Sequence, residues 1–578
     1  MSDRPSQMKK LQTFLTAPPR KNSRREIIFW LSLSLTFTLI YSYMALSEAF
    51  NGNYVVQDDA RQHVFWMQRF VNSQLFPNDL IADYFQSVAP LGYTTLYQFF
   101  ATLGIEPLML SKLLPPVLAL ISALYCFGCT MQLFPVPIAG FISTLLLQQS
   151  LWMKFDVVSA TPRAFVYPFF LGFLYYLLRK NLLGVCLSLV LLALSYPPYV
   201  LIACGMLVAR LVKWKNPGIK LCQNRRDYWF SALAILVAFV MMLPYALHST
   251  EFGPTITRSE AIAYPIFHPE GRQSFFSDNP LYFWLIGERS GILPPLLPPL
   301  IWLGLFLPFA LQKPQIFPLA RRVQNQKVLL DLALTSLALF FAAHAVVFRL
   351  YLPSRYIEHS ARIGGAIATA ILLTLILDWA LNIVTPAARQ SNGKKAIALA
   401  SSLLLAIALV LYPLYDRSFP RTNYRPGRLP QLYEFFQQQP QDILIASLAS
   451  EANNLPTFSH RSVLVAREYA IPVHLGYYRQ FNQRVTDLLR AQYSSDPTQV
   501  QQFIHRYGID FWLVERSAFT PEYIAQDSWL QQYQPEAQRA IAQLNSGTLP
   551  IVATAIDRCT TFQLGDFVVL DADCIVTK

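Results

Sequence analysis

The sequence predicts a polytopic α-helical membrane protein that ends in a small soluble α/β domain. Of its 578 residues, 53% are hydrophobic and only 14% are charged, and the mean hydropathy is +0.32. Soluble globular proteins carry about 25% charged residues, so this composition indicates a membrane protein. The tail, residues 416–578, differs because it has Gln-rich polar stretches, ordinary charge content and short apolar runs.

The first predicted span runs from Ile27 to Leu46. About 20 apolar residues are enough to cross a hydrocarbon core of about 30 Å. A basic leader, residues 1–26, precedes this span, and its cationic residues are Lys9, Lys10, Arg20, Lys21, Arg24 and Arg25. No secretory cleavage site follows, so we expect an uncleaved signal anchor with a cytoplasmic N-terminus.

Later apolar stretches bring the predicted total to about eleven spans within residues 27–415. They lie at 107–131, 136–153, 164–179, 182–196, 198–212, 229–248, 291–311, 329–351, 362–381 and 396–415. The short stretches on either side of Pro197 and Pro198 form either two crossings or a hairpin of incomplete helices. Prolines between Leu293 and Pro299 must break another helix.

The distribution of Lys and Arg predicts the orientation, because short cytoplasmic loops carry the excess of positive charge. The clusters after the leader are Arg179, Lys180, Arg210, Lys213, Lys215, Lys220, Arg225, Arg226, Lys313, Arg321, Arg322, Lys327, Arg389, Lys394 and Lys395. The loops on the outer side are then 47–106, 154–163, 249–290 and 352–361, together with the tail 416–578. The net charge of +13 is mainly an orientation signal, contact with anionic lipid is a secondary expectation, and nucleic acid is not expected as a partner.

The tail is predicted to be an extracytoplasmic α/β domain. Residues 442–446, 462–465 and 510–514 have the short apolar pattern of buried strands. Residues 496–507 have a helical pattern that ends at Gly508. Alternation of strands and helices favours a small α/β fold.

The seven cysteines do not form a metal-binding pattern. Cys559 and Cys574 flank a strand-like stretch, 562–570, that could fold back on itself, and either a disulfide or two free thiols fits this spacing. The chain has no Asn-x-Ser/Thr sequon. We therefore expect a bacterial plasma membrane rather than a eukaryotic secretory route.

Two adjacent carboxylates, Asp58 and Asp59, follow the first span on the predicted outer side. They precede an amphipathic stretch, 64–71, that is expected to lie along the outer membrane surface. One interpretation is structural: Asp59 caps this helix and Gln62 completes a capping box. The other is that a carboxylate at the mouth of a helix bundle acts as a general base or as a ligand of a divalent metal.

A cytoplasmic start, an acidic pair in a long first external loop, a polytopic core and an outward C-terminal domain together resemble the GT-C family of polyprenyl-phosphate-dependent glycosyltransferases. The resemblance covers the whole architecture, although its motif is two residues long. It implies a GT-C-like fold for residues 27–415 and transfer of a sugar from a polyprenyl phosphate to an acceptor. The Trp-Trp-Asp signature of the oligosaccharyltransferase branch is absent from the tail, so transfer of a glycan to asparagine is not assigned.

The resemblance also implies roles for particular residues. The catalytic base falls on Asp58 or Asp59. If a divalent cation (Mn or Mg) is used, the resemblance implies Asp58 and, in the second external loop, Asp156 as its ligands, although a lone loop aspartate can also be merely solvated. His63 and His268 could assist at the site or serve as surface and packing residues.

A lipid phosphate leaving group requires fixed positive charge on the outer side, and the guanidinium fork suits it. The expected substrate-binding residues are Arg163, Arg355 with its neighbour Tyr356, Arg362 and His63. The Arg355-Tyr356 pair is similar to a phosphate-contacting segment of several GT-C enzymes, whereas headgroup contact is the alternative for each arginine. The loop 249–280 could order over bound substrate as a flap.

The expected function is therefore an inverting hexosyl or pentosyl transferase of the cell envelope. Its expected partners are a polyprenyl-phosphate-linked sugar, an unknown acceptor and the lipid bilayer. A transporter or flippase for a lipid-linked intermediate is the main alternative, and a non-catalytic envelope assembly protein is a third. The sequence identifies neither the sugar nor the acceptor.

Overall fold

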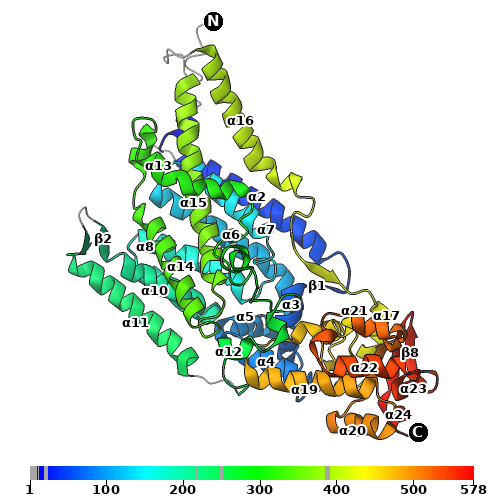
Figure 1. Ribbon diagram of the computed structural model, residues 1–578. Helices are drawn as coiled ribbons and strands as arrows, with labels where there is room; N and C mark the ends of the chain where they lie inside the picture. Colours follow the sequence, from blue (N-terminus) through cyan, green and yellow to red (C-terminus); the bar gives the residue numbers. More distant parts are fainter. Residues whose placement is uncertain are drawn as a thin grey trace.

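A helical part and a C-terminal domain lie at opposite ends of the molecule in the computed structural model (Figure 1). The structure describes residues 10, 12–18, 24–214, 218–247, 251–384 and 391–577. Most of the predicted basic leader, including Lys9, Arg20 and Lys21, lies outside the described residues, as do Lys215 and Arg389.

Each predicted apolar stretch contains a helix, but the described helices differ in length. Six are long and apolar enough to cross a membrane: α2 (Arg24–Ala49), α6 (Pro107–Leu133), α11 (Arg225–Leu247), α14 (Lys327–Ala345), α15 (Ser354–Val384) and α16 (Asn392–Tyr415). Shorter apolar helices are α8 (Val166–Leu178) with the preceding turn η2 (Pro162–Phe165), α9 (Leu182–Ser195), α10 (Pro198–Ala209) and the pair η5 (Pro299–Phe306) and α13 (Leu307–Leu311). The chain is therefore a multi-pass membrane protein, and the total of about eleven crossings stays a prediction.

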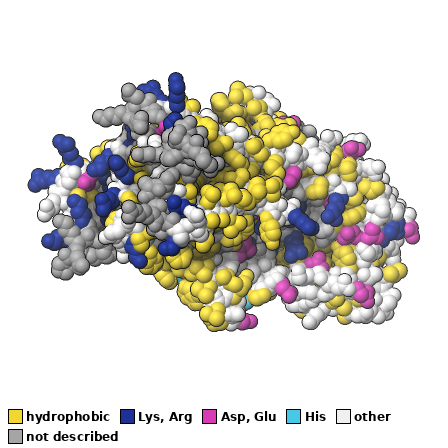
Figure 2. All heavy atoms as spheres, turned by 90° about the horizontal axis from the view of Figure 1, so that it is seen from above, with side chains coloured by type: hydrophobic (Ala, Val, Ile, Leu, Met, Phe, Trp, Pro, Cys, Tyr) yellow, Lys and Arg dark blue, Asp and Glu magenta, His cyan; other side chains and the backbone are white. Residues whose placement is uncertain are grey.

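Helices α7 (Pro137–Trp152) and α15 pack against each other at the centre of the helical part. Every side chain of α7 is buried. Two side-chain amides of α7 donate to backbone carbonyls of other segments. Gln148 Nε2 donates to the Ala119 carbonyl at 2.9 Å, and Gln149 Nε2 donates to the Leu409 carbonyl at 2.8 Å. Buried polar groups in a membrane need such partners. In contrast, most of α11 and α16 is uncovered by protein, and apolar side chains cover much of the surface in Figure 2.

Prolines divide the helical part where the sequence predicts. Helix α9 ends just before Tyr196, and the next helix, α10, begins at Pro198. The predicted span 291–311 is partly wrong, because residues 291–298 are not helical and η5 starts only at Pro299. Proline removes a backbone donor and clashes with the preceding turn, which accounts for the late start.

The first external loop contains β1 (Val55–Gln57), α3 (Asp58–His63), η1 (Phe65–Phe70), α4 (Leu80–Val88) and α5 (Leu91–Thr102). The predicted surface helix at 64–71 is wrong: Phe65, Trp66 and Met67 are almost completely buried. The C-terminal domain covers this segment, since the ring of Tyr469 lies 5.2 Å from that of Phe65. The local pattern of apolar residues in 64–71 cannot show that this segment is buried against a domain that is distant in the sequence.

The C-terminal domain contains a mixed five-stranded sheet of order β6-β5-β7-β9-β8, surrounded by helices. The strands are β5 (Leu444–Ala446), β6 (Ser462–Val463), β7 (Phe511–Glu515), β8 (Thr560–Leu564) and β9 (Phe567–Asp571). Strands β6, β5 and β7 run parallel, while β8 and β9 form an antiparallel hairpin. Helix α20 (Pro497–Tyr507) ends at Gly508, whose φ is +65°. The strands and the helix therefore form an α/β domain where the pattern predicts one.

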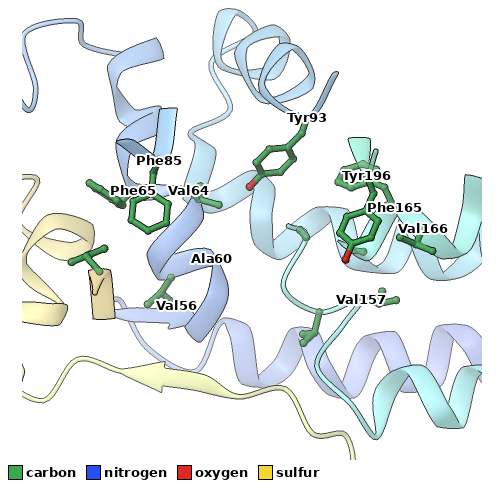
Figure 3. Close-up of a cluster of buried hydrophobic side chains, with 14 of the residues drawn as sticks. Val56, Ala60, Val64, Phe65, Phe85, Tyr93, Val157, Phe165, Val166 and Tyr196 are labelled. Carbon is green, nitrogen blue, oxygen red and sulfur yellow. The ribbon is translucent and has the colours of Figure 1, made fainter. Parts of the chain in front are cut away.

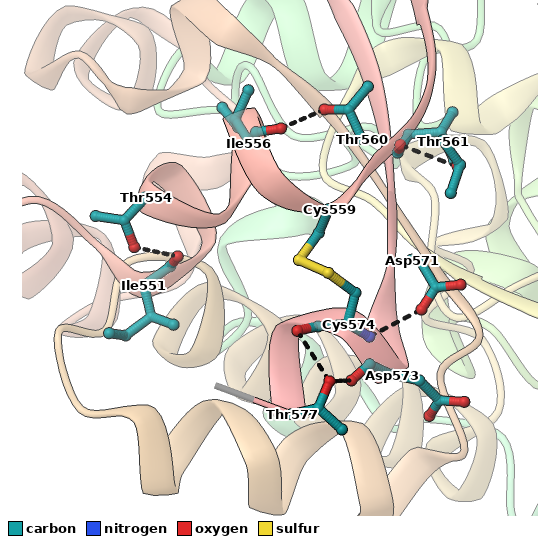
Figure 4. The surroundings of a disulfide bond; sticks show 11 residues. Ile551, Thr554, Ile556, Cys559, Thr560, Thr561, Asp571, Asp573, Cys574 and Thr577 are labelled. Atoms are coloured by element: carbon teal, nitrogen blue, oxygen red, sulfur yellow. Dashed lines mark hydrogen bonds between the residues drawn. A yellow bond between two sulfur atoms is a disulfide. The ribbon is translucent and has the colours of Figure 1, made fainter.

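A disulfide joins Cys559 and Cys574 (Figure 4). Cys559 ends α23 (Ile551–Cys559), and Cys574 lies in α24 (Ala572–Val576). The β8–β9 hairpin lies between them in the sequence, so the bond ties both ends of the hairpin to the two helices.

The predicted flap is attached to the C-terminal domain. The Ile256 amide donates to the Val473 carbonyl at 2.9 Å, and the Leu475 amide donates to the Pro254 carbonyl at 3.1 Å. A Cβ added at Gly476 would lie 2.1 Å from the Phe252 carbonyl oxygen. The close approach of these two backbones therefore requires glycine at this position.

Candidate functional site

Helix α3 is capped by Gln57. The side-chain oxygen of Gln57 accepts hydrogen bonds from the backbone amides of Asp59 at 2.8 Å and Ala60 at 3.1 Å. The predicted capping box is therefore wrong, and Gln62 instead donates to the Glu468 carbonyl at 2.7 Å. Because Gln57 caps the helix, the carboxylate of Asp59 is available for other contacts.

Hydrophobic packing fixes α3 beside the loop that follows α7. Figure 3 shows Ala60 of α3 and Val64, the residue that follows α3, in one buried cluster with Val157 of that loop. Tyr196, from the break between α9 and α10, belongs to the same cluster. This packing positions two charged segments, residues 58–59 and 154–163, next to each other.

Asp58 is held by three partners. Its Oδ1 lies 2.8 Å from Arg61 Nη2 and 3.3 Å from Arg425 Nε. Its Oδ2 accepts a hydrogen bond from Asn423 Nδ2 at 3.1 Å. These contacts attach α3 to the segment around β4 (Tyr424–Pro426), which pairs with β1. Asp58 therefore serves in this arrangement to join the first loop to the start of the tail.

Asp59 forms an ion pair with Arg163. The Asp59 side chain keeps 29% of its accessible surface, whereas that of Arg163 keeps 16%. Arg163 also lies near a second carboxylate, with Nη1 at 3.8 Å from Asp156 Oδ1. Arg163 thus lies between a partly exposed carboxylate and a fully buried one.

Asp156 is completely buried, so it is not a solvated loop residue. Its carboxylate binds Arg362 and accepts a hydrogen bond from the Tyr167 hydroxyl at 2.8 Å. Burial by itself would raise the pKa of Asp156, but Arg362, Arg163 and Lys154 together hold this pKa well below its usual value. These basic neighbours therefore favour the ionised form of Asp156 in the interior.

The first turns of α15 contribute three further charged residues. Glu358 accepts hydrogen bonds from Arg355 at 2.5 Å and from Arg362 at 2.7 Å, and it also binds Lys154. Arg362 is fully buried between Glu358 and Asp156. Arg362 consequently positions these two carboxylates, while Arg355 keeps more of its surface.

The side-chain hydrogen bond of Tyr356 does not involve these charged residues. Its hydroxyl donates to the Leu350 carbonyl at 2.7 Å, and its side chain is 1% exposed. Its predicted contact with substrate stays a prediction, and in this arrangement the residue packs the start of α15.

These charges form what we call the buried charge network, whose members are Asp59, Lys154, Asp156, Arg163, Arg355, Glu358 and Arg362. Four basic side chains face three carboxylates, but burial and the neighbouring Arg362 hold the pKa of Lys154 well below its usual value. The three arginines therefore supply the groups of this network that can bind an anion.

A second group of charges links α3 to the C-terminal domain. Glu468 lies 3.0 Å from Arg61 and 2.5 Å from Arg272 of the loop 251–290. Burial raises the pKa of Glu468, and the two arginines oppose this shift. Sequence reasoning missed Glu468, Arg272 and Lys154 because their partners lie far away along the chain. It also missed Glu358, although Arg355 and Arg362 lie three and four residues away on the same helix face.

His63 lies next to Phe85, with ring centroids 5.5 Å apart. Burial lowers the pKa of His63 to about 4; Asp59 opposes the shift, and Arg163 and Arg272 add to it. The imidazole is therefore neutral at pH 7 and cannot supply a positive charge to a phosphate. The other predicted histidine, His268, bonds to the Ile262 carbonyl at 2.8 Å in the loop.

The donor set does not fit a divalent cation in this arrangement. Within the described ranges, no three His, Cys, Asp or Glu side chains are grouped so that they could hold a metal. Asp156 faces Arg362 and Arg163, and Asp58 faces Arg61 and Arg425. At both predicted metal ligands, guanidinium groups therefore lie where a metal cation would bind.

Comparison with solved structures identifies the fold. The oligosaccharyltransferase from Archaeoglobus fulgidus tethered with an acceptor peptide matches with a TM-score of 0.52 and 13% identity, covering 88% of this chain and 72% of that chain. The archaeal oligosaccharyltransferase AglB from Archaeoglobus fulgidus, in complex with an inhibitory peptide and a dolichol-phosphate, matches with a TM-score of 0.52 and 10% identity over the same shares of the two chains. ArnT from Cupriavidus metallidurans in the apo state matches with a TM-score of 0.44 and 13% identity, covering 94% of this chain and 98% of that chain.

No protein-family model and no curated protein matches the chain. At these identities the likeness to solved structures concerns the fold. The chain has the fold of the GT-C superfamily of membrane glycosyltransferases, which confirms the fold that the resemblance predicted. The bacterial branch stays a prediction.

Proposed function

We propose that this protein is a membrane glycosyltransferase that moves a sugar from a polyprenyl-phosphate donor to an acceptor on the outer side of the membrane. The observation that carries the proposal is the pairing of Asp59 with Arg163 at the partly exposed edge of the buried charge network. The GT-C fold supports it, as does the fact that the archaeal neighbour was solved with a dolichol-phosphate, a lipid-linked phosphate.

In the proposed reaction, Arg163 and Arg355 bind the donor phosphate. Both guanidinium groups retain some exposed surface, and charge-assisted contacts to phosphate are strong. An acceptor hydroxyl oxygen attacks the anomeric carbon from the face opposite the phosphate. The bond between that carbon and the phosphate oxygen breaks, the lipid phosphate leaves with its electron pair, and Asp59 accepts the hydroxyl proton. The product has the inverted configuration.

The ion pair between Asp59 and Arg163 implies that the donor binds before Asp59 deprotonates the acceptor. Without donor, the Asp59 carboxylate is engaged by the Arg163 guanidinium and is not free to accept a proton from an acceptor hydroxyl. A donor phosphate competes for the same guanidinium and releases the carboxylate. Asp59 then becomes a base only when the donor is bound, which protects the activated sugar from early attack.

Asp58 provides a matched control for Asp59. The two residues are neighbours on α3, yet Asp58 contacts Arg61, Arg425 and Asn423 rather than Arg163. We expect Asp59→Asn to lose at least a hundredfold in transfer while Asp58→Asn loses much less, since one positioned base contributes about 10²–10⁴-fold. Both variants should insert and purify normally.

The assay uses membranes that contain the protein, short-chain polyprenyl-phosphate sugars of several kinds, and mass spectrometry of the released polyprenyl phosphate. A parallel arm with a chelator tests the predicted Mn or Mg. Full transfer by both asparagine variants would exclude the carboxylate as the base. Movement of intact donor across the bilayer without its cleavage would favour the transporter instead.

The proposed location is a bacterial plasma membrane, with the buried charge network and the C-terminal domain outside the cell. Figure 2 shows a cluster of Lys and Arg residues on the side of the molecule away from the C-terminal domain, which supports this orientation.

A further inference from the structure

The protein has a small basic cavity at the ends of three apolar helices. It has a volume of about 150 Å³ and lies where α8 and α10 end and α14 begins. Its lining consists of Leu177, Leu178, Lys180, Met206, Arg210, Asn325, Lys327, Val328 and Asp331. The lining has three cationic residues and one carboxylate, and a second carboxylate, Asp227, pairs with Arg210, so one positive charge is in excess.

The cavity is remote from the buried charge network. Tyr167, in the first turn of α8, touches Asp156 of the network, whereas Leu177 and Leu178 in the last turn line the cavity. A helix of this length spans about 20 Å. The cavity therefore lies at the opposite end of the helices and does not belong to the proposed site of transfer.

Part of the positive charge in the cavity is not compensated. Lys327 Nζ is bound to the Ala209 carbonyl at 2.8 Å and to both oxygens of Asp331 at 2.8 and 2.9 Å. Arg210 uses Nη2 for Asp227 at 3.3 Å, but its buried Nη1 has no hydrogen-bond partner among the described residues. Lys180 is exposed and forms no ion pair with any described carboxylate. Arg210 Nη1 is thus a buried donor without a hydrogen-bond partner in the described part of the chain, in a guanidinium that lies 4.6 Å from the centroid of the Phe230 ring, while the Lys180 ammonium is exposed and available to an anion.

Apolar surface adjoins these donors on each helix. Leu183, Val208 and Leu330 lie close in sequence to Lys180, Arg210 and Lys327 respectively, and all three are exposed. A soluble anion would gain nothing from this surface, whereas a lipid would place its acyl chains there. The cavity is smaller than the roughly 300–1,000 Å³ typical of small-molecule pockets, so it suits a headgroup alone.

We propose that this cavity binds the phosphodiester headgroup of an anionic phospholipid, with Arg210 and Lys180 contacting the phosphate and the acyl chains lying along α9, α10 and α14. Basic pockets between membrane helices recognise anionic headgroups in this way. The bound headgroup would hold the start of α14 against the ends of α8 and α10.

The test is native mass spectrometry of the full-length protein titrated with phosphatidylglycerol or phosphatidylethanolamine. We expect Lys180→Gln with Arg210→Gln to weaken binding of phosphatidylglycerol at least tenfold. The matched control is Lys313→Gln with Arg321→Gln, which removes two exposed basic residues outside the cavity and should leave the affinity unchanged. Lys180→Gln alone removes no described ion pair and should weaken binding about fivefold if the double variant fails to fold.

Two results would overturn the proposal. One is equal binding of phosphatidylglycerol by the cavity variants and the control. The other is full displacement of the lipid by soluble glycerol 3-phosphate at millimolar concentration, since that would assign the cavity to a free anion. Neither depends on sugar transfer, so the test is independent of the proposed enzymatic function.

Discussion

At the scale of single residues, the neighbours Asp58 and Asp59 acquire different roles from their partners. Asp58 joins α3 to Asn423 and Arg425 at the start of the tail, while Asp59 reaches the edge of the buried charge network through Arg163. Gln57 makes this difference possible, because it caps α3 in place of Asp59. A single side chain before the acidic pair thus leaves the Asp59 carboxylate free to pair with Arg163, the pair on which the proposed reaction rests.

Removal of Arg362 should be far more costly than removal of an exposed arginine. Arg362→Gln leaves Asp156 and Glu358 buried with fewer partners, and breaking a buried ion pair costs about 3–5 kcal/mol. Arg425→Gln removes only a 3.3 Å contact of a half-exposed side chain and should cost at most about 1 kcal/mol. Thermal unfolding of both variants in detergent measures the difference, and similar shifts would contradict the network as described.

Stability should fall in acid partly because of His63. Burial lowers its pKa from 6.5 to about 4, so the unfolded chain binds a proton in a range where the folded protein does not. The contribution of His63 is complete above pH 6.5 and is lost as the pH falls from about 6.5 to about 4. The unfolding midpoint of His63→Gln should therefore change less between pH 7 and pH 4 than that of the wild type; an identical pH profile would exclude a neutral buried imidazole.

At the scale of elements, the loop 251–290 and the C-terminal domain form one contact rather than a free flap. The backbone bonds of Ile256 and Leu475 hold the loop against the start of α19 (Leu475–Gln492), and Arg272 adds an ion pair with Glu468.

Glycine-to-alanine variants test this contact. Alanine is normally favoured over glycine in a helix by up to about 1 kcal/mol. Gly476→Ala should nevertheless lower the unfolding midpoint, because its Cβ would meet the Phe252 carbonyl oxygen at 2.1 Å. Gly393→Ala, in α16, meets no atom within 4 Å and should be neutral or stabilising. Limited proteolysis should cut 251–290 faster in the first variant only, and equal cleavage rates would contradict the contact.

At the scale of the whole molecule, apolar helices separate a basic side from a side that carries the proposed site and the C-terminal domain. The orientation can be tested with Ser546→Cys in the tail and Lys220→Cys between α10 and α11, both at exposed positions. A membrane-impermeant maleimide should label the first in intact cells and the second only after lysis. The reverse pattern would invert the proposed topology.

The sequence predicted the elements well where local signals are strong. Long apolar stretches contain the expected helices, prolines break them at Pro197 and before Pro299, and Gly508 ends α20. The pattern failed at η1, since an apolar segment buried under a distant domain has the same composition as one that lies on a membrane. Asp59, Arg163, Arg355 and Asp156 were named from the sequence, and the structure brings them into one network with Lys154 and Glu358.

The sequence by itself determined the class of the protein, because hydropathy and charge act locally and need no knowledge of neighbours. Tertiary structure alone decided which charges meet. Lys154 and Glu358 are 204 positions apart, and Arg362 and Asp156 are 206 apart. Ion pairs of this kind depend on how α7, α8 and α15 pack, and packing is a property of the whole fold rather than of any segment.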